Sequence, residues 1–441
     1  MPGLGAVRKS AWLGLLLALS LPAADLATLT ILHTNDLHAR LTPLENGHGG
    51  FARLAGVLRR ERAGCKDCLV VDAGDVVQGS PVSTIFRGLP VYEMANLLGF
   101  DVGTLGNHDF DYGWQQTRKF MGLANHPVVL ANLTDGKGTA FTPAPYVVVP
   151  VNGMRVAVIG LITDSLKDLS TPALMGSWRT APVYETIRRV AAEARMKADV
   201  VVLLGHLDGI EEAAVLHNTP DIAIEVSGHV HTGMQAPLSE GNRVLVRVKA
   251  YGEELGRLET VVDKETKSLA SWNWKRITVD EQAPSAEDLA AQVKHWEDEV
   301  TKVVDQPIGT ALREIPKPEM KTLIEKAMCA ATGADFAFMN AGGVRDILPK
   351  GQLLARHVWN IMPFDNLVVT GRFKGSELPA VVAAGRTIDP NREYTLAVSD
   401  FTAVNQSAPS QLAASGLEFG KDGPLLRDVI IDWVRKQQVL E

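Results

Sequence analysis

Thiol groups are scarce in this chain, which has three cysteines among 441 residues. Cys65 and Cys68 are spaced closely enough to form a small surface disulfide, and no thioredoxin-like pattern surrounds them. Cys329 stands alone in a helical pattern, which is typical of a small buried residue. A metal centre in this chain would therefore rely on nitrogen and oxygen ligands rather than on a cluster of thiolates.

Basic residues are also few, because 44 Lys and Arg stand against 51 Asp and Glu and leave a net charge of −7. The sequence has no basic block of the kind that indicates nucleic-acid binding, and no internal repeat or low-complexity tract. An acidic protein that handles an anionic substrate must gather positive charge locally, and bound metal ions can provide it.

Long apolar runs are missing except near the start, where residues 11–21 form a stretch too short to span a bilayer comfortably. Basic residues precede it and Ala23 and Ala24 follow it, so residues 1–24 are predicted to be a signal peptide, with an uncleaved membrane anchor as the alternative. No cysteine at the cleavage region and a polar C-terminal tail argue against a lipid anchor. We expect an exported protein, periplasmic or extracellular, with no stable membrane anchor.

The length favours two domains. Residues 28–280 alternate between strand and helix patterns, with helical spacing over 51–61 and 183–197 and a hairpin over 146–162 that turns at an Asn-Gly pair. A mixed sheet with helices on its faces fits this order.

A second, smaller unit follows. Ser285 and Asp288 have the spacing of a helix start, and residues 285–304 are predicted to be a helix that connects the two domains. Residues 305–441 then form a smaller α/β domain, in which a helix over 320–332 ends at Gly333.

Several short apolar runs end on side chains that bind metals. They lie in residues 30–38, 70–75, 105–111, 201–206 and 228–231. The runs have the size of buried strands, and the strand ends are where an open α/β sheet places its ligand site. Aspartate, histidine and asparagine that converge there are typical of a hydrolase with two metal ions.

The spacing suggests which residues share a cation. Asp36 and His38 are two apart, so on an extended strand end both would point to the same side. Asp75 has two carboxylate oxygens and can bridge two cations. The other candidate ligands are Asn107, His206 and His229 for the second cation, and His231 for the first. This set suits two divalent ions, zinc or manganese first, with iron or cobalt possible.

Two such cations about 3.5–4 Å apart can hold a bridging hydroxide and draw charge from a phosphoryl group. His108 directly follows Asn107, so its side chain is expected to point toward the substrate. Asp111 can hold the imidazole in one tautomer, and the pair can protonate the leaving oxygen. Asp72 and His33 are assigned structural roles near the site.

These blocks resemble the calcineurin-like metallophosphoesterases. The resemblance is carried by Asp36-Leu37-His38, Gly74-Asp75-Val76-Val77-Gln78-Gly79-Ser80, Gly106-Asn107-His108-Asp109-Phe110-Asp111, Gly205-His206 and Gly228-His229-Val230-His231. Gln78-Gly79-Ser80 and Phe110-Asp111 are similar to the 5′-nucleotidase branch, which includes bacterial periplasmic UDP-sugar hydrolases. The resemblance implies an α/β fold, with an N-terminal four-layer αββα sandwich and a smaller C-terminal domain that binds the nucleoside and can rotate toward the metals.

The resemblance also implies roles for single residues. One metal would be held by Asp36, His38, Asp75 and His231, the other by Asp75, Asn107, His206 and His229, with His108 and Asp111 as the catalytic dyad. In the second domain, Asn340, Gly342, Gly343 and Arg345 match the motif Asn-x-Gly-Gly-(Ile/Val)-Arg, whose arginine offers a planar fork to phosphate. Phe364 matches a phenylalanine that stacks on the base, with core packing as the alternative.

Two segments of the second domain depart from this family pattern. Residues 400–410 stand where a Gly-Gly-Asp-Gly-(Phe/Tyr) segment is usual, and they are read as contributing neither the glycines nor a second stacking aromatic. Residues 314–324 replace a stretch with a phosphate-binding arginine, for which Arg313 or Lys317 can substitute. The hydrolytic centre is therefore expected to be complete and the base clamp to be half missing.

The sequence thus predicts an exported phosphohydrolase with two metal ions that releases phosphate from nucleoside 5′-monophosphates or related nucleotides. The alternatives are hydrolysis of another ester, such as a 2′,3′-cyclic phosphodiester, a nucleotide-sugar pyrophosphate or a thiosulfonate, and a non-catalytic binding protein on the same scaffold. The expected partner is a small phosphoester and not a nucleic acid. The oligomeric state does not follow from the sequence.

Overall fold

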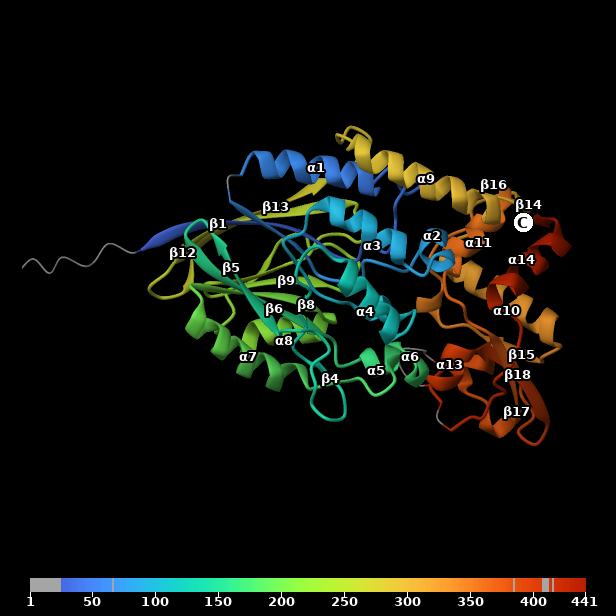
Figure 1. Cartoon of the computed structure of the whole chain (residues 1–441). Helices are drawn as coiled ribbons and strands as arrows, with labels where there is room; N and C mark the ends of the chain where they lie inside the picture. Colours follow the sequence, from blue (N-terminus) through green and yellow to red (C-terminus); the bar gives the residue numbers. More distant parts are fainter. Residues whose placement is uncertain (1–24, 66, 384, 407–411, 415) are drawn as a thin grey trace, which may run out of the picture.

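The computed structural model describes residues 25–65, 67–383, 385–406, 412–414 and 416–441. The predicted signal peptide, residues 1–24, lies outside the described residues. Within them, no helix has the length and apolar character needed to cross a membrane. Figure 1 shows two halves side by side, the first running from blue to yellow and the second from orange to red.

The first half contains a five-stranded sheet. Its strands are, in spatial order, β13 (Ser268–Thr278), β12 (Glu254–Asp263), β1 (Leu26–Thr34), β2 (Cys68–Asp72) and β3 (Val102–Gly103). β1, β2 and β3 run parallel, whereas β12 is antiparallel to β1. The carboxyl ends of β1 and β2, which the sequence marked as candidate ligand positions, therefore meet at one edge of the sheet.

A six-stranded sheet faces the first one. Its order is β10 (Leu238–Glu240), β11 (Arg243–Val246), β9 (Ile224–Gly228), β8 (Val200–His206), β6 (Met154–Ile162) and β5 (Tyr146–Val151). The predicted hairpin is confirmed, because β5 and β6 are antiparallel and turn at Asn152 and Gly153, both with positive φ. β6, β8 and β9 are parallel, so their carboxyl ends also share one edge.

Three apolar layers hold the first half together. Leu29 and Ile31 of β1 pack between the two sheets against Val202 of β8, whereas Leu32 points to the other side. Beyond the first sheet lie α1 (Phe51–Ala63), α2 (Pro81–Ile85), α3 (Leu89–Ala95) and α9 (Glu287–Val304); beyond the second lie α7 (Val183–Lys197) and α8 (Gly209–Asn218). The predicted four-layer αββα arrangement is thereby confirmed.

Smaller elements connect these layers. They are η1 (Asn96–Leu98), η2 (Asn107–Phe110), α4 (Trp114–Leu123), α5 (Leu166–Leu169), α6 (Pro172–Met175) and the strand pair β4 (Leu133–Thr134) and β7 (Arg179–Thr180). Cys65 and Cys68 form a disulfide between α1 and β2, whereas Cys329 is a half-buried free thiol.

The second half has two three-stranded sheets. One contains β16 (Gly351–Leu354), β14 (Pro307–Ala311) and β19 (Val439–Leu440); the other contains β15 (Phe336–Phe338), β18 (Glu393–Ser399) and β17 (Val368–Lys374). Its helical elements are α10 (Lys317–Thr332), α11 (Ala355–Ile361), α12 (Ala380–Ala383), α13 (Asp400–Val404), α14 (Leu426–Gln437), η3 (Ala341–Gly343) and η4 (Gly375–Glu377).

Two predicted helix starts are displaced. α10 ends at the left-handed Gly333 as predicted, but it begins at Lys317 rather than residue 320, because Pro318 is tolerated in a first turn. α9 begins at Glu287, and the expected cap by Ser285 does not form. Asp288 instead accepts a hydrogen bond from Arg59 of α1 at 2.7 Å, so tertiary contact replaces the local cap.

α9 runs along the top of both halves in Figure 1. It packs on α1 at one end, and near its other end Arg356 of α11 pairs with Asp305 at 2.6 Å. The proposed domain boundaries at 28–280, 285–304 and 305–441 stay a prediction. Two further contacts join the halves directly: Arg40 pairs with Asp346 at 3.1 Å, and the Thr84 hydroxyl donates to the carbonyl of Pro363 at 2.8 Å.

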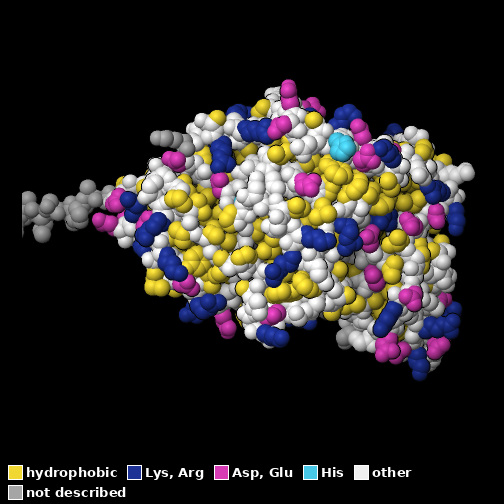
Figure 2. Space-filling model, in the orientation of Figure 1, with side chains coloured by type: hydrophobic (Ala, Val, Ile, Leu, Met, Phe, Trp, Pro, Cys, Tyr) yellow, Lys and Arg dark blue, Asp and Glu magenta, His cyan; other side chains and the backbone are white. Residues whose placement is uncertain are grey.

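The face in Figure 2 shows basic and acidic side chains interspersed among apolar ones. No continuous basic stripe crosses the described part of this face. This distribution agrees with the net charge of −7.

Glu225 on β9 is fully buried, and neither carboxylate oxygen has a hydrogen-bond partner among the described residues. Burial, reinforced by Glu212 of α8 and only partly opposed by Arg247, raises the pKa of Glu225 well above its usual value. The native state therefore holds a proton that the unfolded chain releases near pH 4.5.

Because the native pKa is the higher one, this group lowers the free energy of unfolding as pH rises above that value, by up to about 1.4 kcal/mol per pH unit. Glu225→Gln removes the titration. The melting temperature of the variant, measured relative to that of wild type, should therefore be higher at pH 8 than at pH 5. Glu93→Gln, on the exposed face of α3, is the control, and a difference for Glu225→Gln that stays constant with pH would contradict the argument.

Candidate metal centre and cavity

Two groups of potential ligand atoms lie at the shared edge of the two sheets. Asp36, His38, Asp75 and His231 form one group, and Asp75, His206 and His229 form the other; within each group the ligand atoms lie within 4.8 Å of one another. Asp75 belongs to both, as the sequence suggested for a bridging carboxylate.

The residues in these groups have unusual backbone conformations. Asp36, His38, Asp75 and His229 all have positive φ, between 49° and 75°. Residues other than glycine rarely adopt this region, and such strain gathers at functional sites. The expectation that Asp36 and His38 share a side because they continue an extended strand is wrong: β1 ends at Thr34, and left-handed turns bring the two side chains together.

Hydrogen bonds between neighbouring loops hold these strained conformations. The backbone N–H groups of Asp36 and His38 donate to the carbonyls of Gly74 and Asp75, both at 2.9 Å. Both carboxylate oxygens of Asp36 accept from the N–H of His229 at 3.0 Å. The loops after β1, β2 and β9 therefore brace one another, and the ligand groups are preorganised.

Backbone carbonyls set the tautomers of two histidines. Nδ1 of His206 donates to the carbonyl of Ala73 at 2.8 Å, and Nδ1 of His38 donates to that of Gln78 at 3.0 Å. Each Nε2 is left facing the centre. There, Nε2 of His38 lies 2.9 Å from Nε2 of His231, and Nε2 of His206 lies 3.2 Å from Oδ2 of Asp75.

This arrangement fits a bound cation. Oδ2 of Asp75 is buried and has no hydrogen-bond partner among the described residues. In a metal-free centre, burial lowers the pKa of His206, but the carboxylates of Asp75 and Asp36 outweigh burial and raise this pKa to about 10. Burial raises the pKa of Asp36 to about 6. Protons would thus take the place of positive metal charge, and metal binding would release them.

Asn107 and His108 sit together in η2, just past β3. Oδ1 of Asn107 lies 3.2 Å from Nε2 of His206, close to the second ligand group. The N–H of His108 donates to Oδ1 of Asp75 at 2.8 Å. The short helix thus turns the Asn107 side chain toward the ligand groups and, as expected, the His108 side chain toward a cavity.

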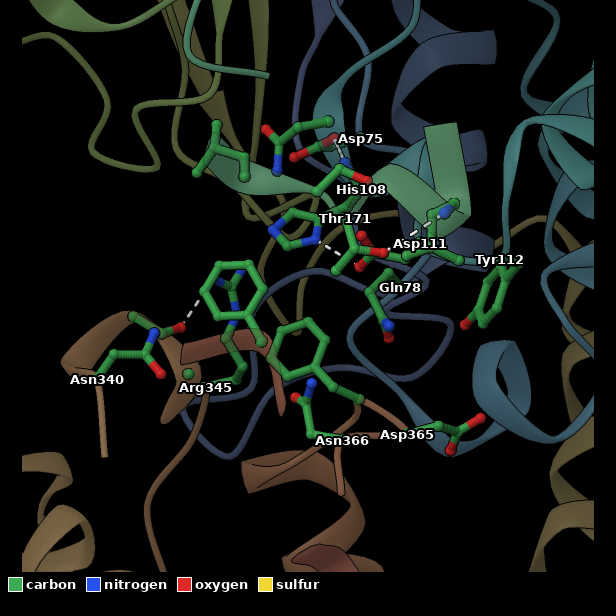
Figure 3. A pocket seen from close by; sticks show the side chains of 18 of the residues that line it. Asp75, Gln78, His108, Asp111, Tyr112, Thr171, Asn340, Arg345, Asp365 and Asn366 are labelled. Carbon is green, nitrogen blue, oxygen red and sulfur yellow. Dashed lines mark hydrogen bonds and ion pairs between the residues drawn. The ribbon is translucent and has the colours of Figure 1, made fainter. Parts of the chain in front are cut away.

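His108 and Asp111 form a close pair. Nδ1 of His108 lies 2.7 Å from Oδ2 of Asp111, and Figure 3 shows this contact on the wall of the cavity. Burial lowers the pKa of His108, but Asp111 and Asp75 outweigh it, so the pKa is raised overall. A protonated imidazole whose Nε2 has no hydrogen-bond partner among the described residues can donate a proton to a leaving oxygen.

The cavity has a volume of about 480 Å³ and lies between the two halves. In Figure 3, Asp75, His108 and Asp111 occupy one side, and Asn340, Arg345 and Asn366 occupy the other. The structure places every candidate substrate residue in its wall: Asn340, Gly342, Gly343, Arg345 and Phe364.

Arg345 and Phe364 approach the ligand groups from the second half. The Phe364 ring stacks near His108, with centroids 5.9 Å apart, and the guanidinium of Arg345 lies 6.0 Å from the Phe364 centroid. Burial, followed by the charge of Arg345, lowers the pKa of His231 to about 3. Phe364 also contacts the second half's apolar core, which confirms core packing, whereas stacking on a base stays a prediction.

The cavity includes residues that the sequence analysis passed over. The expectation that residues 400–410 supply no aromatic is wrong, because Phe401 lines the cavity together with Asp400. Both directly follow β18, so the strand-end rule that selected the metal ligands would also have selected them. The others are Arg87, Tyr112, Asp365, Asn366 and residues 169–171 and 173–174, together with Gln78, which the sequence analysis named only as part of a motif.

Neither proposed replacement for the missing arginine is among the residues that line the cavity. Arg313 pairs with Glu319 on the surface. Lys317 lies at the start of α10, where the nearby charge of Arg345 adds to burial in lowering its pKa.

The two residues assigned structural roles have them. Asp72 accepts hydrogen bonds from the Thr34 hydroxyl at 2.6 Å and from the N–H of Gly74 at 3.0 Å. His33 accepts from the indole N–H of Trp274 at 3.0 Å.

Comparison with known proteins agrees with this geometry. The calcineurin-like phosphoesterase family matches residues 29–233, and the 5′-nucleotidase C-terminal domain family matches residues 304–385. The chain belongs to the 5′-nucleotidase family of calcineurin-like phosphoesterases. In such a 5′-nucleotidase-like chain, the two matched regions supply most of the cavity wall, and Asp400 and Phe401 lie beyond them.

The relatives differ in length. The endonuclease YhcR of Bacillus subtilis is 27% identical over 87% of this chain, and the trifunctional nucleotide phosphoesterase YfkN of the same organism is 26% identical over 82%. The chain spans only 38% and 28% of these two proteins. The protein UshA of Yersinia enterocolitica is 23% identical over 85% of both chains.

Solved structures share the fold of this 5′-nucleotidase-like chain. A 5′-nucleotidase precursor from Thermus thermophilus superposes with a TM-score of 0.85, is 24% identical, and covers 94% of this chain and 97% of its own. The sulfate thiohydrolase SoxB from the same organism has a TM-score of 0.81 at 19% identity and covers 95% of each chain.

The ligand geometry predicts a response to metal. After treatment with a chelator, added Mn²⁺ or Zn²⁺ should raise the melting temperature, by about 5–10 °C at a hundredfold excess over the dissociation constant. Asp75→Asn should remove most of this rise, because Asp75 belongs to both ligand groups.

Asp72→Asn is the matched control, since Asp72 is equally buried nearby but belongs to neither group. Asp72→Asn should lower the melting temperature of the metal-free protein, but added metal should still raise it as in wild type. A full rise in Asp75→Asn, measured by differential scanning calorimetry, would be inconsistent with this centre.

Proposed function

We propose that this protein is an exported phosphohydrolase that uses two divalent cations, zinc or manganese, to release phosphate from nucleoside 5′-monophosphates. One observation carries the proposal: a single cavity joins two carboxylate–imidazole groups, a His–Asp pair, an unpaired arginine and two phenylalanines. The family supports the reaction class, and the second half supports a nucleotide as substrate.

The ligand groups define where phosphate would lie. Asp36, His38, Asp75 and His231 would hold one cation, and Asp75, Asn107, His206 and His229 the other. When bound, these cations supply charge to the phosphoryl oxygens and lower the pKa of water. Tight fixation by the loop hydrogen bonds keeps the ligand side chains in place during the reaction.

His108 and Arg345 act on the same phosphoryl group from two sides. The carboxylate of Asp111 orients His108 through Nδ1, so Nε2 can deliver a proton to the departing sugar oxygen. The guanidinium of Arg345 makes one long hydrogen bond, 3.4 Å to the carbonyl of Gly342, and has no carboxylate partner among the described residues. It is therefore available to a phosphate oxygen.

Phe364 and Phe401 bring aromatic surface to the end of the cavity contributed by the second half. Both line the cavity: Phe364 lies in the loop after α11, and Phe401 lies in the first turn of α13, directly after β18. Flat apolar rings suit a nucleobase, which stacks on them without specific hydrogen bonds. The base clamp of this chain thus has two aromatic members.

Purified protein with Mn²⁺ or Zn²⁺ should release inorganic phosphate from AMP. His108→Ala should lower kcat by about 10²–10⁴-fold, the usual contribution of a proton donor, with metal content unchanged by elemental analysis. His217→Ala, on the exposed surface beside Glu240, should behave as wild type. A panel with UDP-glucose and a 2′,3′-cyclic nucleotide separates the related ester hydrolyses, and absence of phosphate release from all of them by the metal-loaded protein would refute the proposal.

Phe401→Ala should raise KM for AMP about tenfold, because a stacked base loses roughly that much affinity. Hydrolysis of p-nitrophenyl phosphate, which has no base, should change little. Phe419→Ala is a matched control, since Phe419 is a half-buried phenylalanine of the second half that packs on Phe373 and does not line the cavity. Equal effects of both variants on AMP hydrolysis would argue against a base contact by Phe401.

A further inference from the structure

Gln78 is a buried residue at the centre of the cavity whose side chain is only half used. It follows β2 and is 3% exposed, yet it lines the cavity. Its φ of 68° lies in the left-handed region, which is uncommon for a glutamine. The surroundings must therefore hold it there.

The backbone of Gln78 already has a structural task. Its N–H donates to the Ser83 hydroxyl at 3.0 Å, and its carbonyl accepts from Nδ1 of His38 at 3.0 Å. This second bond fixes the tautomer of a candidate metal ligand. Any residue that keeps the backbone conformation can perform this task, so it does not explain why a glutamine side chain is present.

The side-chain amide has a fixed orientation. Oε1 accepts a hydrogen bond from the N–H of Gly79 at 2.9 Å, which turns Nε2 the other way. Nε2 donates to no group among the described residues. Because Gln78 lines the cavity, an acceptor inside the cavity can engage this N–H.

The position of Gln78 indicates which part of a nucleotide supplies this acceptor. In Figure 3 the Gln78 side chain lies between Asp111 on one side and Asp365 and Asn366 on the other. The phosphate end of the cavity is marked by His108 and Arg345, and the base end by the phenylalanines. In a nucleotide the sugar joins the phosphate to the base, and its hydroxyl and ether oxygens are neutral acceptors suited to a neutral donor.

We propose that Gln78 is a substrate-binding residue, which donates its Nε2–H to an oxygen of the sugar that carries the phosphate. The inference rests on the proposed nucleotide hydrolysis and adds recognition of the sugar by the metal-binding half. The first half would then contact the sugar as well as the phosphate group of the substrate. A phosphoester without a sugar would lack this contact.

Three substrates separate this role from a structural one: AMP, ribose 5-phosphate and p-nitrophenyl phosphate. In Gln78→Met, kcat/KM should fall about tenfold for AMP and for ribose 5-phosphate, as expected for one lost hydrogen bond, and less than about threefold for p-nitrophenyl phosphate. Gln78→Glu keeps an acceptor for Gly79 but loses the donor, so it should show the same loss of selectivity for the sugar phosphates.

Gln116→Met is the matched control, because Gln116 is another buried glutamine of the first half, and its Nε2 donates to the carbonyl of Arg87 at 2.8 Å. It should lower stability without changing the ratio between substrates. A uniform loss on all three substrates in Gln78→Met, or wild-type selectivity in Gln78→Glu, would overturn the proposal.

A binding measurement keeps the test independent of catalysis. Adenosine carries the sugar but no phosphate, and calorimetry should show that it binds Gln78→Met about tenfold more weakly than wild type. Equal affinities, or no binding of adenosine by wild type, would overturn the sugar contact even if phosphate is released. If Gln78→Met binds adenosine about tenfold more weakly than wild type but no ester is hydrolysed, only the proposed reaction would be refuted.

Discussion

The arrangement around Asp75 constrains the whole first half. A fully buried carboxylate oxygen without a donor faces imidazole nitrogens of His38 and His206, whose other nitrogens are committed to backbone carbonyls. Acceptors that converge in this way repel one another unless positive charge lies among them. The two sheets bring their strand ends to one edge, and the left-handed loops there depend on hydrogen bonds from their neighbours. The fold thus maintains a centre that only protons or cations stabilise.

The second half is placed by contacts next to that centre. Asp346, which pairs with Arg40, directly follows Arg345, and Pro363, which accepts from Thr84, directly precedes Phe364. Arg40 also lies over the ring of Tyr251, whose hydroxyl is 3.3 Å from Nδ1 of His231. These two contacts are therefore one residue away from Arg345 and Phe364, which line the cavity. The positions of Arg345 and Phe364 in the cavity thus depend on contacts made beside the candidate ligand groups.

Much of the fold and most of the candidate centre were predictable from local patterns. Alternation in the strands, the Asn-Gly turn and Gly333 act over a few residues, and each formed as predicted. The predictions failed where a distant partner intervened. Arg59 drew Asp288 away from a capping role, and Asp36 and His38 converge through left-handed turns held by the loop after β2. Phe401 escaped notice because it was compared with a motif, although its position at a strand end pointed to the cavity.

The sequence by itself determined the kind of chemistry, because aspartate, asparagine and histidine at the ends of buried runs specify oxygen and nitrogen ligands whatever the detailed loop geometry. It also determined the two-part architecture, since hydrophobic periodicity is a local property of the chain. Only the tertiary structure decided that left-handed turns bring Asp36 and His38 together, that Phe401 faces the same cavity as Phe364, and that Gln78 presents an unused donor. These features depend on distances between loops far apart in the chain, which packing of the sheets and of the two halves alone establishes.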